Sequence, residues 1–410
     1  MYLKYFDKFY DQDGYLDISE EEWTYIKETF EKDDVKESLA KVAMTYPIPY
    51  AEISEEVCLK DYKKLKGIWW NDLIIEDEWF ARSEDGYRWG IDYKGKQIYF
   101  KRYNVGNKSS NYFQQKNRWS VDGSVSPGPQ RTWETEKFMT SLMGAAYSLK
   151  LPKIDKKHLR LMIGLRKYIC SQFKPSVAKA IYDYFEADSI LDFSAGWGDR
   201  LAGFYASNSS RYYGIDPRKE NHPIYREQAE FYEKHRSTFL EPTKEVDFFE
   251  SPAEDFDYSQ IKPVDLVFTS PPYFNVERYS YDDTQSWIRY KDINSWNESF
   301  LHRALEKMWT RISSGGHLLV NISDVYSNSK WSTDRGWDKI CDPMNDFINN
   351  ELEGSEYQGC IGMEMAKRPN SGGAGMAKAS DERFLEETIQ RAEETKDKRF
   401  CEPIWVWKKL

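Results

Sequence analysis

The feature that most constrains the fold of this chain is an apolar run that passes directly into two consecutive prolines. Residues 264–268 read VDLVF, and after Thr269 come Ser270, Pro271, Pro272 and Tyr273. The apolar run predicts a buried strand, and the prolines end it because each fixes φ and lacks a backbone N–H group. The turn therefore brings together three groups: a small polar side chain, backbone carbonyls that form no hydrogen bond to a neighbouring strand, and an aromatic ring. This arrangement suits a planar group that carries an amino nitrogen, whereas a rigid strand end without function is the alternative.

A glycine-containing loop lies upstream of this turn. Residues 189–199 read SILDFSAGWGD, a short apolar run followed by an acid and small residues, and a helical stretch follows at 200–206. Glycines let backbone N–H groups approach a ligand at the positive end of the next helix. A second strand, residues 211–216, ends at Asp216, where doubly wound sheets bind a ribose diol. A helix cap before Pro217 is the alternative for this acid.

The motifs share one position relative to the expected strands. A third strand at 246–249 is followed by the loop 251–255, so glycine loop, Asp216, this loop and the Pro-Pro turn all follow successive strands. Ligands bind at the carboxyl ends of strands in open α/β sheets. We therefore expect an α/β fold with a doubly wound, mostly parallel sheet, helices on both faces and a ligand site along this edge.

These motifs resemble those of the S-adenosylmethionine-dependent amino methyltransferases of nucleic acids, over about residues 165–410. The family hallmark is a strand followed by Asp, Asn or Ser, two prolines and an aromatic residue. The resemblance implies a class I methyltransferase (Rossmann-like) fold and S-adenosyl-L-methionine as cofactor. It implies cofactor contacts at Phe173, Lys174, Pro175, Asp192, Ser194, Gly196, Trp197, Gly198, Asp216, Ala253 and Glu254.

This chain departs from the family pattern at two places. Ser251 and Pro252 stand where the loop beside the adenine ring usually has an Asp, so that hydrogen bond would come from Glu254, Asp255 or a backbone group. Trp197 stands in the glycine loop, where smaller residues are usual.

The resemblance implies that catalysis takes place at the Pro-Pro turn. Ser270 Oγ and the backbone carbonyl of Pro271 would accept the hydrogens of an exocyclic amino group, exposing its lone pair. Tyr273 and Phe274 would contact the base, which must be flipped out of a duplex or be single-stranded. None of the five cysteines follows a proline, so the Pro-Cys nucleophile of ring-carbon cytosine methyltransferases is absent.

The resemblance further implies methyl transfer to a base in DNA, with RNA a less favoured partner. Within the family, Ser as the first residue of the tetrapeptide resembles the cytosine N4 enzymes and Asp the adenine N6 enzymes. We favour cytosine N4 and keep adenine N6 open. An RNA or protein-glutamine amino methyltransferase, or a catalytically silent nucleic-acid-binding subunit of the same fold, are the alternatives.

The length of 410 residues predicts two domains. We expect an α+β N-terminal domain at 1–150, with a target-recognition or nucleic-acid-binding role, and the methyltransferase domain at 151–410. Cations interleaved with aromatic residues at 92–119 suit a nucleic-acid surface, although 97–100 also reads as a strand whose rings fill a core. We expect a basic helix at 153–167 either to contact phosphates or to be merely solvated. The cationic glycine loop at 368–376 is expected to be a lid, a nucleic-acid contact or a solvent loop.

The remaining sequence features exclude several classes of protein. The net charge of -10 does not favour nucleic acid as a whole, so binding would depend on local patches. There is no apolar run long enough to span a membrane, no secretory segment and no paired cysteine spacing, so we expect a cytoplasmic protein. The five histidines form no cluster with cysteines, and we expect no metal site. Residues 11–20 predict a turn and a helix capped by Ser19 rather than a calcium loop.

Overall fold

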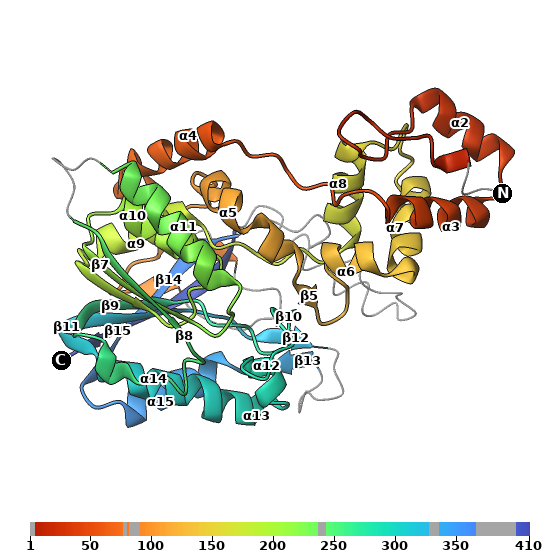
Figure 1. The fold of residues 1–410 in the computed structure, drawn as a ribbon. Coiled ribbons are helices and arrows are strands. Elements are labelled where there is room, and N and C mark those ends of the chain that lie inside the picture. The colour runs from red at the N-terminus through yellow and green to blue at the C-terminus, as the bar shows by residue number, and fades with distance from the viewer. Residues whose placement is uncertain (1–4, 77–79, 82–90, 237–242, 328–335, 366–398) are drawn as a thin grey trace. The chain divides into compact units, whose positions relative to one another are not determined.

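The structure is a computed structural model of the 410-residue chain, and it describes residues 5–76, 80–81, 91–236, 243–327, 336–365 and 399–410. The glycine loop expected at 368–376 lies outside these residues. The chain forms two compact units (Figure 1). Unit 1 comprises residues 1–54, 111–172 and 275–282, and unit 2 comprises 55–110, 173–274 and 283–410.

Unit 1 is mainly helical. Its core is formed by the apolar faces of its helices, with Trp23, Leu39 and Met143 fully buried. The expected cap is confirmed, because Ser19 Oγ accepts a hydrogen bond from the Glu22 N–H group at 3.2 Å. The elements are α2 (Glu20–Thr29), α3 (Lys32–Ala43), α6 (Pro129–Glu134), α7 (Glu136–Ser148), α8 (Lys156–Arg166) and the antiparallel pair β5 (Asp122–Gly123) and β10 (Glu277–Arg278).

Unit 2 contains the expected α/β sheet. Its strands are ordered β8-β7-β6-β9-β11-β15-β14, with β4 and β1 beyond β14. The first five are parallel, and β15 is antiparallel to both of its neighbours. Their bounds are β1 (Ile74–Glu76), β4 (Ile98–Phe100), β6 (Ser189–Asp192), β7 (Arg211–Asp216), β8 (Glu245–Glu250), β9 (Val264–Thr269), β11 (Ile312–Asn321), β14 (Ser355–Glu364) and β15 (Arg399–Lys409). The short strands β2 (Phe80–Ala81) and β3 (Asp92–Tyr93) pair with β15 and β14, and β12 (Val325–Ser327) pairs with β13 (Gly336–Asp338).

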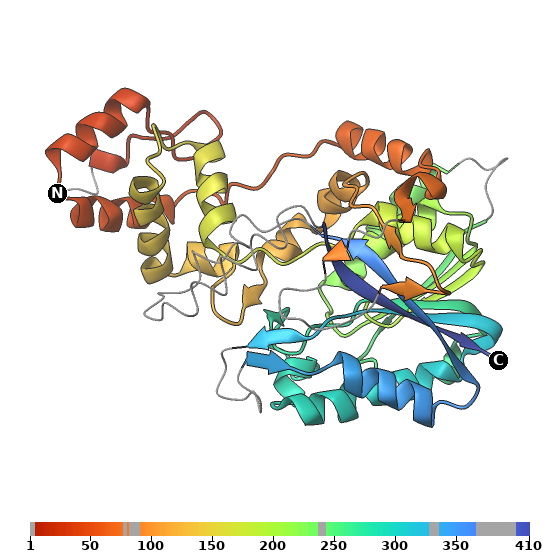
Figure 2. The same ribbon diagram turned by 180° about the vertical axis from the view of Figure 1, so that it is seen from behind.

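Helices cover both faces of this sheet, as Figures 1 and 2 show. One face carries α9 (Pro175–Tyr184), α10 (Asp199–Ala206) and α11 (Asn221–Lys234), and the other carries α13 (Ile293–Trp296), α14 (Arg303–Trp309) and α15 (Cys341–Glu351). The doubly wound, mostly parallel arrangement expected from the sequence is thereby confirmed. Unit 2 also contains α4 (Glu55–Lys66), α12 (Ser286–Arg289), a π-helix (Asn297–His302) and 3-10 turns (Trp70–Leu73, Tyr258–Gln260), and α5 (Asn107–Trp119) continues from unit 2 into unit 1.

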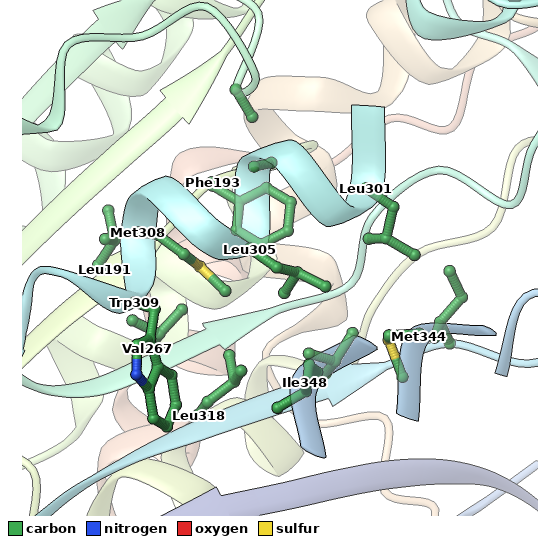
Figure 3. Close-up of a cluster of buried hydrophobic side chains, with 14 of the residues drawn as sticks. Leu191, Phe193, Val267, Leu301, Leu305, Met308, Trp309, Leu318, Met344 and Ile348 are labelled. Atoms are coloured by element: carbon green, nitrogen blue, oxygen red, sulfur yellow. The ribbon is translucent and has the colours of Figure 1, made fainter. Parts of the chain in front are cut away.

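An apolar core fixes the strands that carry the motifs (Figure 3). Leu191 of β6, Val267 of β9 and Leu318 of β11 are fully buried, and they belong to one cluster with Leu305 of α14 and Ile348 of α15. Each side chain of this size contributes about 1.5–3 kcal/mol when it is removed from water. The carboxyl ends of these three strands are therefore held in register.

Residues 1–150 contain both helices and short strands, as expected for an α+β segment, but the two compact units do not follow the expected boundary at residue 150. The reason is a long-range pairing that local sequence does not reveal, because β4 pairs with β14 through Tyr99 and Gly362. Residues 55–110 accordingly belong with the sheet of unit 2.

Most described rings at 92–119 fill cores, as one of the two interpretations predicted. Tyr93, Tyr99 and Phe100 are buried in the sheet of unit 2. Tyr103 and Tyr112 are the more exposed rings, at 43% and 38%. A nucleic-acid role for the remaining cations and exposed rings stays a prediction.

The expected basic helix is α8. Lys156 contacts Glu52, and Lys153 forms an ion pair with Asp155 at 2.8 Å, whereas Lys157 is exposed. Phosphate binding by this helix likewise stays a prediction. No helix in the described part of the chain has both the length and the apolar character needed to cross a membrane.

Candidate active site

The glycine loop between β6 and α10 requires glycine for its backbone. Gly196 and Gly198 have φ values of 60° and 67°, in the left-handed region that side chains disfavour. A Cβ atom on Gly198 would lie 2.1 Å from Oε1 of Gln228 on α11. The loop therefore approaches α11 closely and turns its backbone at the carboxyl end of β6.

Asp192 holds this loop from within the protein. Its side chain is fully buried and accepts hydrogen bonds from Arg200 Nε at 2.6 Å and from the Tyr212 hydroxyl at 2.8 Å. Burial, followed by the charge of Asp192, raises the pKa of Tyr212 well above its usual value, so this hydroxyl remains a donor. Since the carboxylate is bound by the protein's own groups, the predicted cofactor contact of Asp192 is corrected to a role in supporting the loop.

Arg200 was not singled out from the sequence. It is 4% exposed, and besides Asp192 it contacts the Ser194 carbonyl. Its guanidinium lies 5.4 Å from the ring centre of Phe173, which packs edge-on against Phe268 of β9 at 5.5 Å. The structure thus brings Phe173 beside the glycine loop, as expected for the cofactor motif, with Lys174 and Pro175 at the start of α9.

Asp216 lies at the end of β7, as predicted. One carboxylate oxygen accepts from the Gly196 N–H group at 2.8 Å, and the other from the Arg218 N–H group at 2.9 Å. Burial raises the pKa of Asp216 above its usual value, and these two backbone donors act in the opposite direction. Each oxygen keeps a second lone pair, so the carboxylate can also accept hydrogen bonds from two vicinal hydroxyl groups.

Trp197 is accommodated by packing rather than by an open loop. It is 6% exposed, and the guanidinium carbon of Arg218 lies 5.2 Å from its ring centre. Its carbonyl accepts a hydrogen bond from Ser110 Oγ at 3.2 Å. The bulky residue in the glycine loop is therefore part of the core.

The acids of the loop after β8 are bound by groups of the protein itself. Ala253 and Glu254 are buried, and the Glu254 carboxylate accepts from the Tyr290 hydroxyl at 3.0 Å and contacts Arg289. Arg289 also pairs with Asp255 at 2.7 Å. Arg289 thus binds both acids and ties them to the protein, and a cofactor contact of Glu254 stays a prediction.

The Pro-Pro turn follows β9 at the same sheet edge as the glycine loop. Ser194 Oγ and Thr269 Oγ1 are 2.6 Å apart and connect the two motifs directly. Ser270 Oγ donates to Asn321 Oδ1 at 3.3 Å, and the Tyr273 hydroxyl donates to Glu402 Oε2 at 3.3 Å. Burial, then the charge of Glu402, raises the pKa of Tyr273 well above its usual value, so the phenol stays neutral.

Asn321 and Glu402 contact the Pro-Pro turn, and neither residue is predicted above from the sequence. Asn321 ends an apolar strand, and a buried polar side chain in such a run needs a hydrogen-bond partner. That pattern could have identified Asn321. Glu402 comes from β15, far along the chain from Tyr273, and no local pattern marks it.

Phe274 does not serve as a surface for a base. It is 1% exposed, and its ring packs edge-on against Trp296 at 6.1 Å in the core of unit 2. Its φ of 47° is unfavourable for a residue with a side chain, and such backbone persists where the surrounding packing enforces it. The predicted substrate contact of Phe274 is therefore corrected to an anchor that fixes the end of the turn.

Several solved structures are similar to part of this chain. No family model and no curated protein matches the chain. Among solved structures, TrmN from Thermus thermophilus is 12% identical, with 58% of this chain and 49% of that chain covered and a TM-score of 0.33. An rRNA methylase from Streptococcus thermophilus is 9% identical, with 59% and 99% covered and a TM-score of 0.31.

A third similar structure is the plantazolicin methyltransferase BpumL in complex with SAH, which is 13% identical, with 57% of this chain and 82% of that chain covered and a TM-score of 0.30. The chain spans about half the length of TrmN. TM-scores of this size carry no argument about what the chain binds or does. The fold class, a class I methyltransferase (Rossmann-like) fold, therefore rests on the order and direction of the strands in unit 2.

Proposed function

We propose that this chain transfers a methyl group from S-adenosyl-L-methionine to the exocyclic amino group of a base in DNA. The observation that carries the proposal is the position of the Ser270–Tyr273 turn. It follows β9 beside the glycine loop, to which the hydrogen bond between Ser194 and Thr269 connects it. An acceptor for an amino group and a cofactor cradle therefore share one edge of the sheet.

The cofactor cradle fits an adenosyl group at two points. The left-handed backbone of Gly196 and Gly198 keeps side chains out of the loop, and Asp216 retains acceptor capacity for the ribose hydroxyls. When bound, S-adenosylmethionine supplies an electrophilic methyl group on a sulfonium. The residues of the chain then have to hold the acceptor nitrogen in line with that methyl group.

The turn prepares the nitrogen for this reaction. The lone pair of an exocyclic amino group is delocalised into the ring, so the group is a poor nucleophile. Hydrogen bonds to Ser270 Oγ and to the Pro271 carbonyl favour a pyramidal nitrogen and expose the lone pair. Tyr273 contacts the ring of the base, and its neutral hydroxyl is held by Glu402. No covalent enzyme intermediate is required.

Ser270 favours cytosine N4 as the position methylated, with adenine N6 the alternative base. Tritiated S-adenosylmethionine, incubated with duplex DNA, denatured DNA, RNA and protein, tests the acceptor class. We expect label in DNA, and nuclease digestion with mass spectrometry then identifies the nucleoside. Label in RNA or protein alone contradicts the DNA proposal, and cofactor binding without transfer favours a catalytically silent subunit.

Replacement of Tyr273 tests the assignment of the turn. We expect Tyr273→Ala to abolish transfer while S-adenosylmethionine binds with unchanged affinity, because the ring serves the base. Tyr273→Phe is the matched control, since it keeps the ring and loses only the hydroxyl bond to Glu402. An equal loss of cofactor affinity in Tyr273→Ala would show that the ring belongs to the cofactor pocket.

A further inference from the structure

Asn321 occupies a position that fixes the orientation of its amide. It is 1% exposed at the end of β11, and its Nδ2 donates to the Pro403 carbonyl of β15 at 3.0 Å. A carbonyl oxygen only accepts hydrogen bonds, so the amide nitrogen must face Pro403. The reversed orientation would place two acceptor oxygens against each other in a buried site, with no hydrogen between them.

The fixed amide also fixes the Ser270 hydroxyl. With Nδ2 facing Pro403, Asn321 Oδ1 faces Ser270 Oγ at 3.3 Å. A hydroxyl group has one hydrogen and two lone pairs, and Oδ1 can only accept. Ser270 therefore donates its hydrogen towards Asn321, and its lone pairs are left to accept from another group.

The second polar neighbour of Ser270 is Tyr273. The Ser270 side chain lowers the pKa of Tyr273, against the larger effect of burial. Because Tyr273 donates its own hydrogen to Glu402, its oxygen could compete with Asn321 for the hydrogen of Ser270. An amide carbonyl is the stronger acceptor of the two, and in either case Ser270 donates to the protein and accepts from the substrate.

We propose that Asn321 is a positioning residue that turns Ser270 into an obligate hydrogen-bond acceptor for a neutral amino group. This inference rests on the proposed function of the turn. It also defines which side chains position 270 accepts. Serine and asparagine can donate to Asn321 Oδ1 and accept from a substrate, whereas an ionised aspartate has no hydrogen for Oδ1 and repels it.

Single replacements at position 270 test this selection in the presence of the native Asn321. The assay measures methyl transfer from tritiated S-adenosylmethionine to denatured mixed-sequence DNA, or to RNA if RNA is the acceptor found. We expect Ser270→Ala to lower kcat about 10- to 100-fold, the size of one hydrogen bond near a developing charge. Ser270→Asn should retain more activity than Ser270→Ala, and Ser270→Asp less.

A double-mutant cycle separates positioning from a general structural role. Asn321→Ala should lower kcat about as much as Ser270→Ala, and the double variant should fall no further than about twofold below either. In the Asn321→Ala background, Ser270→Asp should lose much less activity than in the native background, because Oδ1 is gone. Asn297 is the matched control: it is 4% exposed and donates to the Lys339 carbonyl at 2.9 Å.

The results distinguish the two levels of the proposal. Asn297→Ala combined with Ser270→Ala should give independent effects. The role of Asn321 is refuted if the losses of kcat in Asn321→Ala and Ser270→Ala multiply in the double variant, as independent effects do. It is also refuted if Ser270→Asp is as active as Ser270→Asn. In both cases the proposed function stands. A wild-type protein that transfers no methyl group overturns the proposed function, and the role of Asn321 with it. Should Asn321→Ala fail to fold, the comparison at position 270 still decides the question.

Discussion

Replacement of Arg200 by methionine measures how strongly the buried ion pair supports the glycine loop. Arg200 and Asp192 have side-chain exposures of 5% and 0%, and Arg200 Nε lies 2.6 Å from Oδ2. Removal of one partner leaves the other charge buried without compensation, which costs about 3–5 kcal/mol. For a folded unit of the size of unit 2, this loss of free energy corresponds to a fall in melting temperature on the order of 10 °C.

The assay is thermal unfolding of Arg200→Met, Asp192→Asn and the double variant, without cofactor. We expect each single variant to be less stable than the native protein. The double variant should lose less stability than the two single variants together, because no unpaired charge remains buried in it. Lys96→Met is the control, since its pair with Glu76 at 3.0 Å is 61% and 59% exposed and contributes about 1 kcal/mol or less. Single variants no less stable than this control would refute the reasoning.

Three further outcomes follow from the site and its surroundings. In chemical denaturation, Gly198→Ala should lower the free energy of unfolding by at least about 1–2 kcal/mol, because residue 198 has a positive φ. Gly164 lies on a helix with open space at the Cβ position, so Gly164→Ala should raise the free energy of unfolding by about 1 kcal/mol in the same assay. Burial lowers the pKa of His302 from 6.5 to about 4. As the pH falls from 6.5 to about 4, the unfolded state therefore binds a proton that the folded state does not, and the protein loses stability. Melting curves of His302→Gln should show a smaller fall in melting temperature over that pH range. Asp216→Asn should weaken S-adenosylmethionine binding about tenfold or more in calorimetry, whereas Glu254→Gln should lower the melting temperature and leave that affinity nearly unchanged.

The strands and loops at the ligand edge could be predicted because their signals are local. The strands expected at 211–216, 246–249 and 264–268 agree with β7, β8 and β9 to within one residue at each end, and the apolar run before the glycine loop forms β6. Apolar runs that end in glycine, in an acid or in proline are readable within about ten residues of sequence. Their common edge then follows from the parallel order of the sheet.

The parts that could not be predicted depend on contacts between distant segments. Tyr99 reaches the sheet by pairing with Gly362, and this pairing moves residues 55–110 out of the expected N-terminal domain. Glu402 meets Tyr273 only because β15 inserts between β11 and β14. A sequence pattern gives the identity of such residues but not the neighbours that assign their roles.

The carboxylates at the ligand edge illustrate how neighbours decide a role. Asp192, Asp216 and Glu254 are alike in sequence, because each is an acid at the end of a strand or in the loop that follows it. Arg200, eight positions after Asp192, and Arg289, 35 positions after Glu254, fold onto these two acids and neutralise them. Asp216 instead accepts from backbone N–H groups, which hold the carboxylate in place without using all of its lone pairs. Neutral hydroxyl groups can complete that set of hydrogen bonds. Among the three, Asp216 is therefore the carboxylate that we expect to bind a ligand, whereas Arg200 and Arg289 tie the other two to the scaffold.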